Sequence, residues 1–160
     1  MYLRRDNSMM HSRFIVSTHD GDDKYIVTGN QSETIGKMAI SSKDGQVLVK
    51  IRLVLSGILS TFVISNSYER FTVVATNSSK SLKLQIHGID WAIRPSADFR
   101  TFEIFDSQGN LVMTQKAQNY SRKGYYTLDI LLPQRELFCI AVAICADTLN
   151  FNDSFVPATI

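Results

Sequence analysis

The chain has 160 residues, of which 44% are hydrophobic and 20% are charged, and its formal net charge is +2. This length allows one domain with a buried core, and the composition is that of an ordinary globular protein. The net charge is too small to indicate nucleic-acid binding by itself. No apolar run follows the basic residues Arg4 and Arg5, so we expect no secretory leader.

Most of the chain before residue 132 breaks into short runs with polar and apolar side chains in alternation, separated by turn residues. A period of two is typical of β-strands that have one buried face. In the run 82–87, for example, the two leucines and Ile86 share one face, and the polar residues share the other. The predicted strands, about twelve in number, are 2–4, 13–18, 25–28, 35–41, 47–53, 61–65, 70–76, 82–87, 91–94, 101–106, 111–116 and 125–131.

Three of the predicted hairpins share one spacing. In each, an apolar strand residue precedes the glycine of a polar turn by seven positions, and a second strand follows. The three pairs are Phe14 with Gly21, Met38 with Gly45 and Phe102 with Gly109. We interpret them as one structural unit used three times, with glycine where the turn needs a positive φ.

The segment 137–146 is a run of ten apolar residues, and Pro133 and Asn150 suit a helix start and a helix stop. A ten-residue helix is about 15 Å long, roughly half the thickness of a bilayer core, so protein rather than lipid should surround it. Many short strands avoid exposed edges by closing into a barrel. We therefore predict a mainly β fold: a closed barrel of about twelve strands around a helix at about 133–149, in one domain spanning 1–150, with a tail at 151–160.

Cys139 and Cys145 both lie in this apolar run, six residues apart. On a helix they are about 120° apart around the axis, so they cannot bridge each other. We interpret them as buried hydrophobic residues in a reducing compartment. A reactive thiol is the alternative, but no base or cation stands beside either cysteine.

Several segments resemble the LURP-one-related family: the N-terminal Tyr-Leu-Arg-Arg, the hairpin that begins at Phe14, the hairpin that begins at Phe102, and the segment 136–147. The resemblance covers about residues 1–150. The family is grouped with the tubby C-terminal domain and the phospholipid scramblases, which implies a twelve-stranded barrel around a central helix.

The resemblance also implies a function, because tubby domains bind phosphoinositide headgroups through basic surface side chains and scramblases act on membrane lipids. We therefore expect a non-catalytic module for anionic phospholipid or phosphoinositide headgroups, with no cofactor. Its expected location is cytoplasmic, with peripheral contact to a membrane. The alternative is a structural or protein-interaction barrel without a lipid ligand.

The candidate ligand-binding residues are basic side chains near predicted turns, where phosphate groups can be bound by charge-assisted hydrogen bonds. They are Lys80, Lys83, Arg122 and Lys123, with Arg4 and Arg5 near the N-terminus. Since the chain holds seventeen Lys and Arg residues, the alternative is that these are ordinary solvated charges.

Other chemistry finds little support in the sequence. The acidic segment 19–23 lacks the ligand ladder of an EF-hand and is interpreted as a hairpin turn, and the three histidines have no metal-ligand spacing. No nucleophile elbow or phosphate loop is present, so no catalytic residue is predicted. Asp147 follows the apolar run directly, and we expect it to pair with a basic group or a backbone donor and to anchor the helix.

Overall fold

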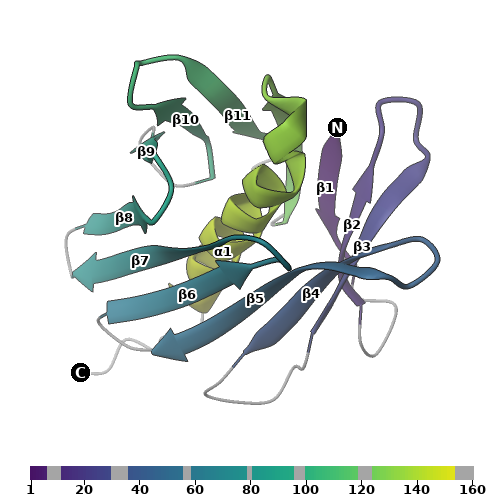
Figure 1. The fold of residues 1–160 in the computed structure, drawn as a ribbon, viewed down its shortest axis with the longest axis horizontal. Helices are drawn as coiled ribbons and strands as arrows, with labels where there is room; N and C mark the ends of the chain where they lie inside the picture. The colour runs from purple at the N-terminus through teal and green to yellow at the C-terminus, as the bar shows by residue number, and fades with distance from the viewer. Residues whose placement is uncertain are drawn as a thin grey trace.

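The computed structural model describes residues 1–6, 12–29, 36–55, 59–78, 81–95, 100–118 and 124–153. Figure 1 shows strands arranged around one long helix. The described strands are β1 (Tyr2–Arg5), β2 (Ser12–Ser17), β3 (Asp23–Gly29), β4 (Lys37–Ser42), β5 (Val47–Leu55), β6 (Leu59–Ser65), β7 (Arg70–Ser78), β8 (Ser81–His87), β9 (Trp91–Pro95), β10 (Phe102–Asp106), β11 (Leu111–Ala117) and β12 (Tyr125–Ile130). A 3-10 turn (Pro133–Arg135) then leads into α1 (Glu136–Asp153).

The twelve strands form one antiparallel sheet in the order β8-β7-β6-β5-β4-β3-β2-β1-β12-β11-β10-β9. The first strand pairs with the last, and every other ladder joins strands that are consecutive in the sequence. The edge strands β8 and β9 lie in contact but share no ladder in the described part of the chain. The barrel is therefore nearly closed, and the prediction of a twelve-stranded barrel is confirmed.

Helix α1 lies inside the ring of strands, as Figure 1 shows. Each residue from Cys139 to Ala146 has 0% exposed surface, since inward-facing side chains such as Ile40 and Phe62 complete the core around it. Residues that are apolar on every face of a helix need such surroundings. Among the described residues, no helix meets the length and hydropathy needed to cross a bilayer.

The helix continues to Asp153, beyond the predicted end near residue 149. Asn150 therefore does not stop it. An asparagine lowers helix propensity by only about 0.7 kcal/mol or less, which does not end a helix whose preceding turns are fully packed. Residues 154–160, which make up most of the predicted tail, lie outside the described residues.

The three equivalent hairpins are confirmed in detail. In each hairpin, the residue that opens the turn donates its amide to the carbonyl of the residue four positions later, and its own carbonyl accepts a hydrogen bond from the amide of the turn glycine. The residues that open the three turns are Thr18, Ser42 and Asp106. In all three hairpins the strand pairing shifts register two residues after the leading apolar residue, that is, after Val16, Ile40 and Ile104. The turn glycines have positive φ: 91° at Gly21, 88° at Gly45 and 81° at Gly109. The acidic segment 19–23 is thus part of a hairpin turn.

The helix is tied to the barrel near its start by Glu136. Its carboxylate accepts a hydrogen bond of 2.7 Å from the hydroxyl of Tyr25 and forms an ion pair of 2.9 Å with Lys24 Nζ. Burial and the neighbouring carboxylate raise the pKa of Tyr25. Both tyrosine and lysine belong to β3, so this tie fixes the helix start to one strand of the barrel.

Further along the helix, Asp147 is buried and accepts hydrogen bonds from Arg5 of β1 and from the hydroxyl of Tyr126 of β12. The predicted pairing with a basic group is confirmed. Its position differs from the prediction, because Asp147 lies within the helix rather than at its C-terminus. The contact joins the helix to the first and last strands of the chain, which pair with each other in the middle of the sheet.

Candidate ligand-binding groove

The structure describes only some of the basic residues predicted from the sequence, so their convergence on one surface stays a prediction. Lys83 is exposed on β8, whereas Lys80, Arg122 and Lys123 lie outside the described residues. Arg5 is committed to Asp147, so it is not available to a ligand. Arg4 lies 3.9 Å from a carboxylate oxygen of Asp23.

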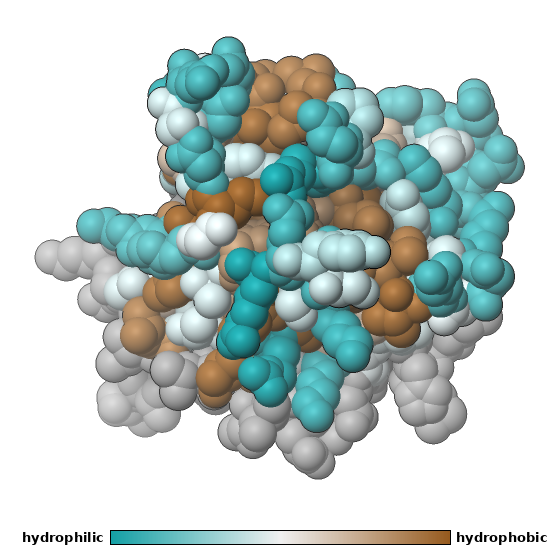
Figure 2. Space-filling model, in the orientation of Figure 1, coloured by the Kyte–Doolittle hydropathy of each residue, from teal (hydrophilic) through white to brown (hydrophobic). Residues whose placement is uncertain are grey.

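A different set of basic residues gathers on the outer face of the barrel. A groove of about 1060 Å³ runs across β3 to β7 and the turn that joins β6 to β7. Hydrophilic side chains run over the middle of this side of the molecule, with hydrophobic patches on either flank (Figure 2). Four cations line the groove: Lys37, Lys50, Arg52 and Arg70. We call it the basic groove.

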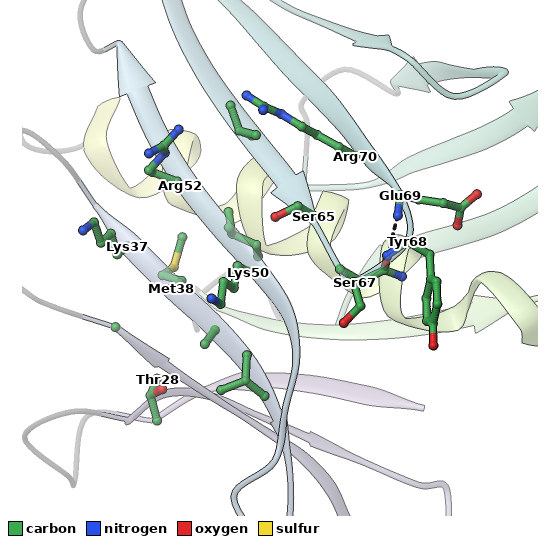
Figure 3. A pocket seen from close by; sticks show the side chains of 16 residues that line it. Thr28, Lys37, Met38, Lys50, Arg52, Ser65, Ser67, Tyr68, Glu69 and Arg70 are labelled. Carbon is green, nitrogen blue, oxygen red and sulfur yellow. Dashed lines mark hydrogen bonds between the residues drawn. The ribbon is translucent and has the colours of Figure 1, made fainter.

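The strand register explains why these cations meet. Lys37 of β4 is paired directly with Arg52 of β5. Lys50 precedes Arg52 by two positions, so both side chains point to the same outer face. Figure 3 shows these side chains on neighbouring strands of the groove.

The fourth cation comes from β7. Ser65 of β6 is paired with Lys50 on one side and with Arg70 on the other, so these three residues form one row across three strands. In Figure 3 the side chain of Arg70 extends back over the groove toward Arg52. The groove is therefore built from two adjacent cross-strand rows.

Within the described part of the chain, no carboxylate pairs with the cations of the groove. All four cations are exposed, and none forms an ion pair with another described residue. Among the described lining residues only Glu69 carries a carboxylate, and it is paired with Arg135 Nη1. Like charges directly opposite each other in a sheet are unfavourable, so Lys37 beside Arg52 represents a cost that a bound anion would remove.

The rest of the lining suits a polar ligand on an apolar base. Hydroxyl groups of Thr28, Ser65 and Ser67 face the groove and can donate to anionic oxygens. Ala39 and Val63 lie in the same cross-strand rows as the cations. Such an arrangement, a few charged groups around an apolar floor, is typical of small-molecule sites.

Part of this groove had a sequence signal. Lys50 and Arg52 alternate with Val49, Ile51 and Leu53 in the run 47–53, which places two cations on the outer face of an otherwise apolar strand. No sequence pattern predicted that Lys37 and Arg70 would join them, because their positions beside Arg52 and Lys50 depend on which residues pair across the strands.

Two smaller cavities do not gather cations in this way. One of about 530 Å³ lies over β9 and β10, where the guanidinium carbon of Arg94 sits 4.5 Å from the ring centre of Phe105. The other, of about 150 Å³, lies beside the helix start and holds the paired charges of Glu69, Arg135 and Glu136. Both cavities are lined by charges of opposite sign, so neither presents a cluster of cations to an anionic ligand.

The cysteines are buried. Cys139 and Cys145 are free and have no exposed surface. Burial raises the pKa of the Cys139 thiol to about 12 and also raises the pKa of Cys145. The interpretation of both residues as buried hydrophobic side chains is confirmed.

The fold and groove together define a nearly closed antiparallel barrel with a buried C-terminal helix and an outer basic face. Residues 1–147 match the LURP-one-related family, and the chain therefore belongs to that family. The chain has no significant match to a curated protein or to a solved structure.

Proposed function

We propose that this protein is a non-catalytic binding module and that its basic groove holds the phosphorylated headgroup of an anionic phospholipid, such as a phosphoinositide. The observation that carries the proposal is the direct pairing of Lys37 with Arg52, with Lys50 next to them and no carboxylate partner among the described residues. Phosphate oxygens are strong acceptors that offset such charge.

The size of the groove supports a headgroup as its ligand. Its volume of about 1060 Å³ is at the upper end of ordinary small-molecule sites, which are roughly 300–1,000 Å³. The groove is also open along the outer wall of the barrel, so a headgroup can enter while its acyl chains stay in a bilayer. This arrangement favours a peripheral protein at an anionic, cytoplasmic membrane surface.

The test is co-sedimentation with vesicles of three compositions: phosphatidylcholine alone, phosphatidylcholine with phosphatidylserine, and phosphatidylcholine with phosphatidylinositol bisphosphate. We expect binding to the anionic vesicles, strongest with the bisphosphate, and weaker binding at high salt. Each basic group near such a surface contributes about 1 kcal/mol, which corresponds to about fivefold in affinity. Lys50→Gln should therefore weaken binding by about that factor.

Lys116→Gln is the matched control, since Lys116 is an exposed lysine on β11 away from the groove and its loss changes the net charge equally. Equal effects of the two substitutions would contradict a specific groove. Absence of binding to all three vesicles would favour the alternative, a structural or protein-interaction barrel. Lys83→Gln, measured beside them, tests the surface predicted from the sequence.

A further inference from the structure

One aromatic side chain at the edge of the basic groove is almost fully exposed. Tyr68 has 93% exposure, the highest of the large hydrophobic residues in the described chain, and it lines the groove. It sits in the turn between β6 and β7, and Figure 3 shows it beside Ser67 at the edge of the groove. An isolated exposed side chain is ordinary, but this one lies at the edge of a groove that four cations line.

The turn that carries Tyr68 is held in one conformation. Asn66 Oδ1 accepts hydrogen bonds from the amides of Tyr68 at 2.9 Å and Glu69 at 2.7 Å. The amide of Asn66 donates to the carbonyl of Glu69 at 3.0 Å. The ring is thus presented on an ordered backbone, so little further ordering is needed when it contacts a partner.

A second exposed apolar residue lines the same groove. Val47, the first residue of β5, has 48% exposure. In the β5–β6 ladder Lys50 pairs with Ser65. Because β5 and β6 are antiparallel, the start of β5 and the turn after β6 lie at the same end of the groove. The end of the groove therefore has an apolar rim, and the cations lie further along it.

We propose that Tyr68 and Val47 form a membrane-contacting rim that enters the interfacial layer of an anionic bilayer when the groove binds a headgroup. This inference depends on the proposed function. Tyrosine suits the boundary between headgroups and acyl chains, because its ring is apolar and its hydroxyl can remain hydrated. The occupant is a bilayer because the four neighbouring cations complement an anionic membrane surface.

The first test separates headgroup binding from membrane contact. Binding of inositol trisphosphate is measured by calorimetry, and binding to phosphatidylinositol bisphosphate vesicles by co-sedimentation. We expect Tyr68→Ser to weaken vesicle binding about fivefold, because apolar contact with the bilayer is lost, and to weaken trisphosphate binding much less. Lys50→Gln should weaken both. An unchanged vesicle affinity of Tyr68→Ser would overturn the inference.

The second test reports the location of the side chain directly. The chain has one tryptophan, Trp91, which is only 9% exposed, so a new tryptophan in Tyr68→Trp is readily distinguished from it. We expect its emission to shift to shorter wavelength on vesicle binding and to be quenched by brominated lipids. Bound protein with neither change would place the rim outside the bilayer and overturn the inference. If neither trisphosphate nor vesicles bind the natural chain, the proposed function fails, and this inference fails with it.

Discussion

Arg5 and Asp147, which are 142 positions apart in the chain, form a buried ion pair between the first strand and the central helix. The side chains have 15% and 3% exposure. Removal of one partner of a buried pair leaves an uncompensated charge and typically costs about 3–5 kcal/mol. We expect Asp147→Asn to lower the free energy of unfolding by about 3 kcal/mol, measured by urea denaturation.

The exposed pair between Arg135 and Glu69 is the control for this prediction, since its side chains have 33% and 48% exposure. Surface pairs are worth about 0–1 kcal/mol. Arg135→Gln should therefore have a small effect. Similar losses for the two substitutions would mean that the Arg5–Asp147 contact has no special role in holding the helix to the barrel.

Gly124 and Gly109 allow a second matched comparison, since both have φ of +81°. A Cβ on Gly124 would lie 2.7 Å from Cβ of Arg5, whereas a Cβ on Gly109 would have no other heavy atom within 4 Å. Both alanine variants carry the cost of positive φ, about 1 kcal/mol, but only Gly124→Ala also displaces Arg5. We expect thermal unfolding to show a clearly larger loss for Gly124→Ala. Equal losses would contradict a tight contact at this position.

The two cysteines provide a test of the core position of the helix. Because burial raises the pKa of both thiols, to about 12 for Cys139, they are protonated and inaccessible near neutral pH. We expect neither thiol to react with a disulfide reagent at pH 8 in the native protein, and both to react in denaturant. Rapid labelling of the native protein would place the helix outside the barrel.

The elements of this fold are largely readable from the sequence, because each depends on local patterns. Alternation gave the twelve strands, and the spacing of Phe14 to Gly21 recurs because the same turn and bulge occur three times. The buried helix was predicted from the apolar run 137–146, which is also a local pattern. Its end was less readable, since packing outweighs the weak preference of Asn150.

The basic groove was harder to predict, because it depends on pairing between strands. Lys37 approaches Arg52 only through the β4–β5 register, which a bulge after Ile40 helps to set. A shift of one residue would turn Lys37 to the other face. The sequence pattern favoured basic residues near turns. Of the four ligand-binding residues predicted in this way, only Lys83 lies in the described chain, so that surface stays a prediction.

Alkaline pH should weaken the fold through Tyr126. Burial and the adjacent negative charge of Asp147 raise its pKa above the ordinary 10.0. In the unfolded chain the phenol ionises near pH 10, whereas in the folded protein it keeps its proton. The stabilisation is therefore complete below about pH 10 and is lost as the pH rises above it.

We expect urea denaturation to show a decrease in the free energy of unfolding as the pH rises above about 10. Tyr126→Phe should flatten this decrease, although it also removes the hydrogen bond to Asp147 and so lowers stability at neutral pH. An unchanged pH profile of Tyr126→Phe would assign the decrease to other groups, with Tyr25 of β3 the next to test, because its pKa is raised as well.

Lys37 tests whether the groove is maintained for binding rather than for stability. It stands directly opposite Arg52, and like charges in that position are destabilising by some tenths of a kcal/mol. We expect Lys37→Gln to leave the free energy of unfolding unchanged or to raise it slightly, while it weakens binding to bisphosphate vesicles by about fivefold.

This opposition between stability and binding is what a ligand site predicts, since binding groups are often kept at a cost to the fold. Lys116→Gln, outside the groove, should change neither property by much. If Lys37→Gln instead destabilises the protein by more than about 1 kcal/mol, Lys37 is a structural residue of the barrel wall, because surface substitutions without a packing role usually stay within about 0.5 kcal/mol.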